Sequence, residues 1–180
     1  VPAYAPGNPD LAVAAFDTFV TTVDTANNEV ASQTSALQTA RDARLDLFKG
    51  TYGLIKRAAQ IRDYIASVDV KGKNSVEYKK IQKVVMRMRG MRLSKKKVST
   101  TAGATEPKTL STSEVSFGSM LNAGKEVLQV IKGFTGYAPS STHITLANFT
   151  TFVANLDTKN SEIAEKLTDW DNAIETRADL

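Results

Sequence analysis

Positively charged side chains gather in the middle of this 180-residue chain. Residues 71–108 hold 12 lysines and arginines and only two acids, Glu77 and Glu106, a net charge of +10. The rest of the chain holds 11 basic and 17 acidic residues, a net charge of −6. This uneven distribution is more informative than the net charge of +4, because it predicts a basic surface that attracts anions.

Some of these cations share one face of a predicted helix, and a lysine run follows them. They are Lys79, Lys80, Lys83, Arg87, Lys95, Lys96 and Lys97. Such a stripe can bind nucleic-acid phosphates with steep salt dependence. No aromatic residue is interleaved with the lysines, so stacking of single-stranded bases is unsupported. A solvated helix face, an acidic protein or a membrane surface explains the same pattern.

Residues that could bind metal or perform catalysis are few. The chain has no cysteine, which excludes disulfides, thiolate zinc sites and cysteine nucleophiles. His143 is the sole histidine, and no residues at ligand spacing accompany it, so we expect an exposed or capping role. Arg44 and Arg177 could form an anion-binding pair, but we favour stems that pack while the heads pair with acids.

Two acidic and amide clusters have the same spacing, Asp24 to Glu29 and Asp157 to Glu162. Paired carboxylates suggest metal or acid–base chemistry. However, the clusters belong to separate predicted helices, and neither has the histidine at i+3 that di-iron bundles require. We expect structural contacts between helices, and we predict no catalytic residue, no metal and no cofactor.

The clusters match because the chain is internally duplicated. Residues 4–47 recur without a gap as residues 137–180, with 17 identities in 44 positions. Chance would give about three. Thr18-Phe19-Val20, for example, recurs as Thr151-Phe152-Val153.

Each copy reads as one long amphipathic helix. Apolar residues step by three and four from Phe16 to Leu47 and from Phe149 to Leu180, a heptad-like seam. Asn8 and Ser141 occupy equivalent positions and are predicted to cap the two helices. A helix of ~35–40 residues would span roughly 55–60 Å.

Further helices are predicted between the copies. Gly50 and Gly53 break the first helix, and an apolar stripe from Leu54 to Val68 follows. Ser75 is predicted to cap the next helix. Residues 93–112 read as a basic, mobile linker, and a helix is predicted over 113–135.

These patterns predict an all-α fold, an elongated antiparallel four-helix bundle with two long duplicated helices. We expect a single domain, residues 1–180, that buries every apolar stripe. Period-two alternation is absent, which argues against strands. Copy one also lacks the helix that precedes copy two, which suggests that the chain is an excerpt of a longer protein.

Several segments resemble a group of helical proteins from Bacteroidetes bacteria for which no activity is established. The segments are Val1 to Pro6, Ala40 to Arg44, Ile61 to Ile65, Ser75 to Lys79 and Leu110 to Phe117. The resemblance implies a helical bundle and provides no catalytic residues.

The sequence therefore favours a non-enzymatic structural or interaction module with a protein partner. The alternative is a nucleic-acid-binding protein that uses the basic stripe of residues 79–97. Self-association as a homo-oligomer stays open. No apolar run reaches the roughly 20 residues of a transmembrane helix, and a cytoplasmic location is favoured.

Overall fold

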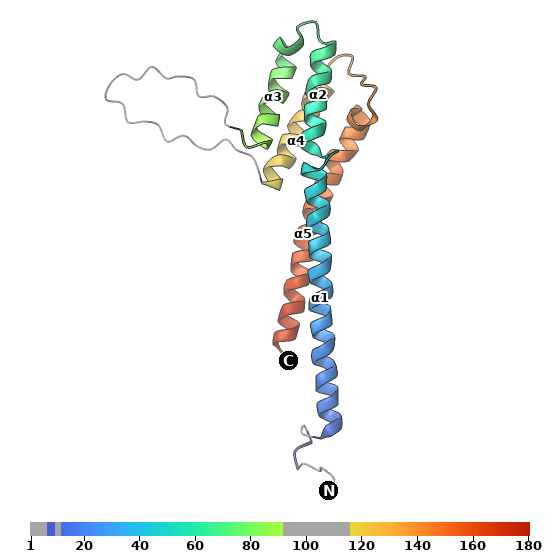
Figure 1. The fold of residues 1–180 in the computed structure, drawn as a ribbon, viewed down its shortest axis with the longest axis vertical. Helices are drawn as coiled ribbons and strands as arrows, with labels where there is room; N and C mark the ends of the chain where they lie inside the picture. The colour runs from blue at the N-terminus through green and yellow to red at the C-terminus, as the bar shows by residue number, and fades with distance from the viewer. Residues whose placement is uncertain (1–6, 10–11, 92–115) are drawn as a thin grey trace, which may run out of the picture. The chain divides into compact units, whose positions relative to one another are not determined.

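The computed structural model describes residues 7–9, 12–91 and 116–180, and these residues are helical with no strand (Figure 1). Two short 3-10 turns, Gly72–Asn74 and Thr142–Ile144, accompany the α-helices. The α-helices are α1 (Val13–Lys49), α2 (Leu54–Val68), α3 (Val76–Met88), α4 (Phe117–Lys132) and α5 (Leu146–Ala178). The predicted all-α class and its two long helices are confirmed.

The chain forms two compact units. The terminal unit comprises residues 1–42 and 161–180, and the central unit comprises residues 43–160. The terminal unit has 3 basic and 11 acidic residues, a net charge of −8. The central unit has 20 basic and 8 acidic residues, a net charge of +12. The two units are therefore of opposite sign.

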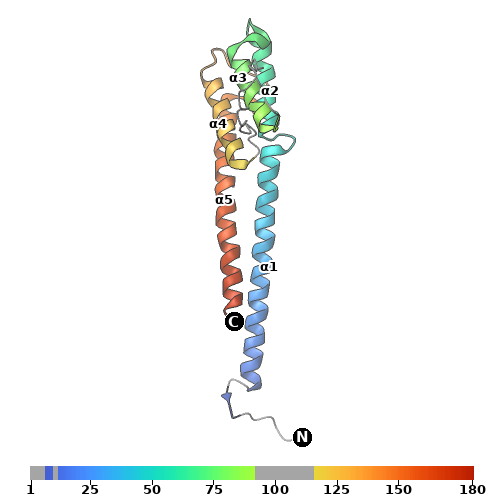
Figure 2. The same cartoon turned by 90° about the vertical axis from the view of Figure 1, so that its left-hand side faces the viewer.

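In the terminal unit, α1 and α5 pair side by side and antiparallel (Figure 2). Trp170 of α5 donates its Nε1 hydrogen to Thr34 Oγ1 of α1 at 3.0 Å. Leu37 and Ala40 of α1 and Ala173 of α5 are buried. Small and apolar residues at this seam let the two helices approach closely.

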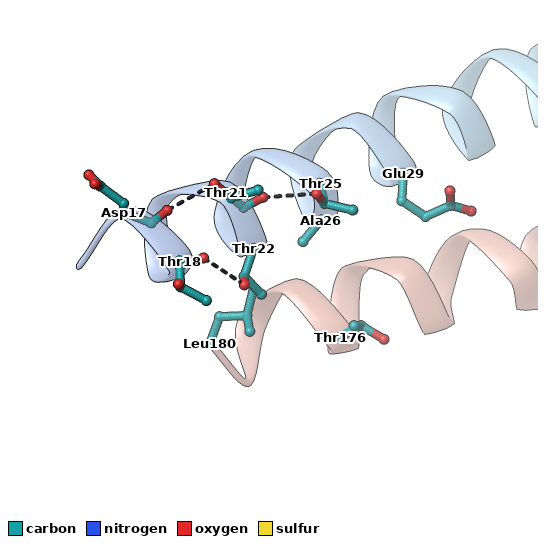
Figure 3. A pocket seen from close by; sticks show the side chains of 9 residues that line it. All are labelled: Asp17, Thr18, Thr21, Thr22, Thr25, Ala26, Glu29, Thr176 and Leu180. Atoms are coloured by element: carbon teal, nitrogen blue, oxygen red, sulfur yellow. Dashed lines mark hydrogen bonds between the residues drawn. The ribbon is translucent and has the colours of Figure 1, made fainter. Parts of the chain in front are cut away.

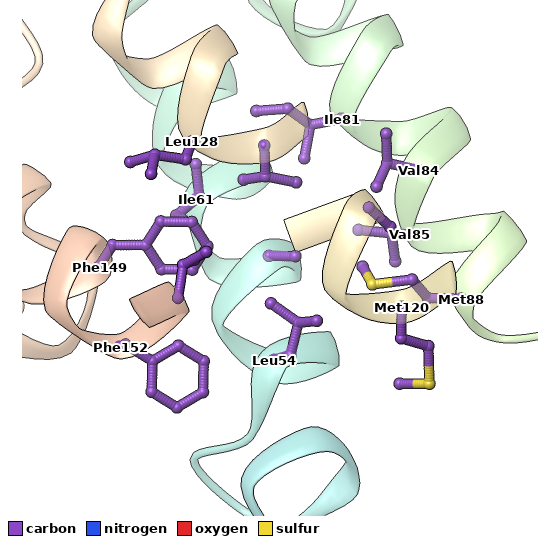
Figure 4. Close-up of a cluster of buried hydrophobic side chains, with 14 of the residues drawn as sticks. Leu54, Ile61, Ile81, Val84, Val85, Met88, Met120, Leu128, Phe149 and Phe152 are labelled. Carbon is purple, nitrogen blue, oxygen red and sulfur yellow. The ribbon is translucent and has the colours of Figure 1, made fainter. Parts of the chain in front are cut away.

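The central unit packs α2, α3, α4 and the first half of α5 around one core. Figure 4 shows side chains from all four helices converging there. The largest fully buried side chains include Leu54, Ile61, Ile81, Met120 and Phe149. The predicted stripe of α2 contributes Leu54, Ala58, Ile61 and Ile65 to this core, while Val68 at its end is exposed.

Local signals set several helix ends. Ser75 caps α3 as predicted, because its Oγ accepts from the Tyr78 amide at 3.2 Å. The prediction for Ser141 is wrong, because Ser141 begins only a 3-10 turn and makes no side-chain cap bond. Thr145 takes that role for α5, where its Oγ1 accepts from the Asn148 amide at 3.3 Å.

The predicted basic linker at 93–112 lies outside the described residues. The helix predicted over 113–135 is described as α4, from Phe117 to Lys132. Ser116 precedes this helix, and its Oγ accepts from the Ser119 amide at 3.2 Å.

Gly124 lies at a close approach of α4 to α2. A Cβ atom at Gly124 would lie 3.1 Å from Leu54 Cδ1, which is tighter than ordinary van der Waals contact. Gly118, near the start of the same helix, has no neighbouring atom within 4 Å of such a Cβ. Substitutions at the two glycines therefore distinguish the effect of tight packing, at Gly124, from the effect of helix propensity, at Gly118.

We predict that Gly124→Val lowers the free energy of unfolding by about 1–3 kcal/mol, because the side chain overpacks the Leu54 contact. Gly118→Ala should leave it unchanged or raise it by up to about 1 kcal/mol, because alanine favours the helix and meets open space. Urea unfolding of both variants measures the difference. Equal losses at the two positions would contradict the close approach.

Candidate functional site

The predicted basic stripe lies on α3, where the structure describes part of it. Lys79, Lys80 and Lys83 are exposed, while Arg87 is half-buried and pairs with Glu126 of α4. Lys95, Lys96 and Lys97 lie outside the described residues. The structure therefore brings together three exposed lysines, with Arg87 already compensated by a carboxylate.

A shallow groove of about 420 Å³ runs between α3 and α4 beside these lysines. Lys80, Lys83 and Arg87 line one side, and Glu126 and Gln129 line the other. A phosphate on this surface would meet the Glu126 carboxylate as well as the lysines. Glu126 thus weakens the attraction for anions that the stripe alone would produce.

The other sequence candidates have structural contacts. His143 is exposed, and its ring stacks on Tyr52 with centroids 4.8 Å apart. The Arg44 guanidinium lies 4.1 Å from the Phe117 ring centroid, and its Nη1 donates to Asn160 Oδ1 at 3.3 Å. Arg44 therefore packs against an aromatic ring and an amide, and the pairing of its head with an acid stays a prediction. Arg177 is exposed in the last turn of α5.

The two acidic clusters lie on different helices, Asp24 to Glu29 on α1 and Asp157 to Glu162 on α5. Within the described part of the chain, no group of three or more His, Asp or Glu residues is placed to hold a metal ion. Asp157 instead pairs with Lys125 of α4, with Oδ2 and Nζ 3.1 Å apart. In addition, none of the described helices is long and apolar enough to cross a membrane.

The feature that sequence reasoning missed is an apolar stripe with two different environments. In copy two, Phe149 is 0%, Phe152 7% and Val153 4% exposed. Figure 4 shows Phe149 directed toward Ile61 of α2 and Leu128 of α4. This copy, on α5, is therefore part of the core of the central unit.

The same three residue types recur in copy one with the opposite exposure. Phe16 is 61%, Phe19 49% and Val20 41% exposed on α1. We call Phe16, Phe19 and Val20 the Phe16 stripe. The expectation that the bundle buries every apolar stripe is wrong here, because no helix among the described residues of the terminal unit covers these three side chains. Large aromatic side chains grouped in water are typical of interaction surfaces.

A groove of about 620 Å³ lies on the same part of α1, in the terminal unit. Threonines of α1 line it together with Thr176 and Leu180, and Figure 3 shows Thr22 next to Leu180. Thr22 and Thr25 donate their hydroxyl hydrogens to the carbonyls of Thr18 and Thr21, four residues earlier. Their methyl groups thus make the groove wall more apolar than its composition suggests.

The cover of the buried stripe includes a cation above an aromatic ring. The Arg57 guanidinium of α2 lies 3.9 Å from the Phe152 ring centroid. Arg57 also donates from Nη1 to the His143 carbonyl at 2.8 Å and from Nε to the Tyr52 carbonyl at 2.6 Å. Burial lowers the pKa of Arg57 without removing its charge. The contact is a positioned cation–π interaction.

The turn before α5 is also fixed by aromatic contacts. Tyr137 donates its hydroxyl hydrogen to the Ile144 carbonyl at 2.6 Å and meets Tyr64 edge to face. Burial, with a smaller contribution from Tyr64, raises the pKa of the Tyr137 hydroxyl. Tyr4, its counterpart in copy one, lies outside the described residues.

Comparison with known proteins gave no match to a family model, to a curated protein or to a solved structure. The candidate site therefore stands on the geometry of the chain and on its internal duplication. The internal duplication indicates the site, because it places the same three residue types in two different environments.

We predict that the same substitution at equivalent positions has very different costs. Phe152→Ala should lower the free energy of unfolding by about 3–4 kcal/mol, because it opens a cavity in the core. Phe19→Ala should change it by less than about 1 kcal/mol, because half of that ring is already in water. Denaturant unfolding measures both values, and similar losses at the two positions would show that Phe19 is buried.

Proposed function

We propose that this chain is a non-enzymatic interaction module that binds another protein through the Phe16 stripe. One observation carries the proposal: Phe16, Phe19 and Val20 are exposed, while their duplicates Phe149, Phe152 and Val153 are covered by helices. Covering this stripe with a helix would bury apolar surface, which lowers the free energy by about 25 cal/mol per Å² buried. The helices that cover Phe149, Phe152 and Val153 provide a template for the partner surface.

The helix that carries the stripe is poorly stabilised by its own residues. Seven of the 13 residues from Val13 to Thr25 are valine or threonine, which are weak helix formers. No acidic residue occupies the first turn of α1 to offset its dipole. A helix of this composition gains its stability from packing, which supports a partner for this segment.

We expect the proteins that bind this chain to depend on the Phe16 stripe. The double variant Phe16→Ser and Phe19→Ser should lose them, because it removes most of the exposed aromatic surface. Affinity purification from the native host, quantified by mass spectrometry, compares it with wild type.

Leu45→Ser with Leu167→Ser is the matched control, because both leucines are partly exposed on other parts of the chain. This control should retain the partners that the stripe variant loses. If the wild type and the stripe variant capture the same proteins, the proposal fails.

The second candidate function is nucleic-acid binding by α3, which the exposed Lys79, Lys80 and Lys83 favour. We expect it to be the weaker candidate, because Glu126 compensates Arg87 on the same surface. A salt titration with generic DNA and RNA tests it. Binding that weakens steeply with salt, and is reduced when Lys80 and Lys83 become glutamine, would favour this function over the first.

A further inference from the structure

We propose that the partner of the Phe16 stripe is a basic two-helix segment of a separate protein. This segment presents an apolar face flanked by an arginine and a lysine. The inference rests on the function proposed above and adds the chemistry of the partner. Its template is the chain itself, since copy two shows how two helices cover an identical stripe.

Two polar contacts accompany the apolar cover in the central unit. Arg57 of α2 lies over the Phe152 ring at 3.9 Å. Lys125 of α4 lies 3.1 Å from the Asp157 carboxylate. Both contacts place a cation of the covering helices against α5. The cover is thus apolar in the middle and basic at its edges.

The two residues that these cations contact have identical counterparts in copy one. Phe19 is the counterpart of Phe152, and Asp24 is the counterpart of Asp157. Phe19 and Asp24 are exposed on α1. Residues 13–29 contain three acids, Asp17, Asp24 and Glu29, and no lysine or arginine. This surface is therefore complementary in charge to a basic helix pair.

The stripe also continues an interface that the terminal unit already uses. Ala26, Leu37 and Ala40 form the buried side of α1 against α5. Phe19 lies one heptad before Ala26, and so it extends the same seam. A partner helix on the stripe would prolong the antiparallel pairing toward the start of α1.

A second copy of this chain fits the stripe less well. Each chain has two such stripes, but its single covering surface on α2 and α4 is filled by its own α5. Two Phe16 stripes packed on each other would bring Asp17, Asp24 and Glu29 close to the same acids, which is repulsive.

A synthetic helical hairpin tests the inference with the full chain as its receptor. The probe joins the α2 sequence, residues 54–68, to the α4 sequence, residues 117–132, through a flexible linker. We expect one-to-one binding by fluorescence anisotropy. Phe19→Ser should weaken it at least about tenfold through lost apolar burial. Asp24→Lys should weaken it about fivefold, because it turns an ion pair into a repulsion.

A charge exchange makes the assignment specific. A probe with Lys125→Asp should bind wild type weakly and should regain its affinity on the Asp24→Lys protein. Asp171→Lys is the matched control, because it makes the same charge change at an exposed site of α5 in the same unit and should have no effect. All the protein changes are at exposed positions, and circular dichroism verifies that the variants fold.

Three results would overturn the inference. The first is no binding of the probe up to about 1 mM, a free energy of only about −4 kcal/mol. The second is binding that is unchanged by the substitutions at Phe19 and Asp24. The third is a wild-type dimer in sedimentation that Phe19→Ser abolishes. The last would assign the stripe to a second copy. If the probe fails while the Phe16→Ser and Phe19→Ser variant still loses its cellular partners, only the chemistry assigned to the partner is wrong.

Discussion

The burial of apolar surface by α2 and α4 is the interaction on which the rest of this structure depends. Phe149, Phe152 and Leu156 of α5 leave water only because these helices cover them. The close approach at Gly124 and the cation above Phe152 follow from that cover. Where an identical stripe recurs on α1 without such a cover, the aromatic rings remain exposed. One sequence pattern thus forms a core in one unit and a surface in the other.

The two units also differ in net charge. The terminal unit has a net charge of −8 and the central unit a net charge of +12, so the exposed stripe lies on the acidic unit. Apolar burial provides most of the affinity at a docking surface, while charge selects among partners and accelerates encounter. The two properties together favour a basic amphipathic partner. The lysines of α3 are a second charged surface, reduced in effect by Glu126.

Periodicity in the sequence was sufficient to predict the helices and most of the central core. Gly50 and Gly53 mark the break after α1, and Ser75 marks the start of α3, because these residues act through local backbone geometry. The role of Ser141 could not be predicted, since a 3-10 turn places Thr145 at the cap instead. The exposure of Phe16 was also missed, because periodicity shows which face is apolar and does not show whether another helix covers it.

The accessibility of equivalent positions in the two copies tests the central claim most directly. The chain has no cysteine, so Val20→Cys and Val153→Cys each introduce a single thiol without background. Valine to cysteine is a small change in volume, so both variants should fold. The account predicts that a thiol reagent labels Cys at position 20 rapidly in the native protein and labels position 153 only when the protein unfolds. Equal labelling rates at the two positions would contradict it.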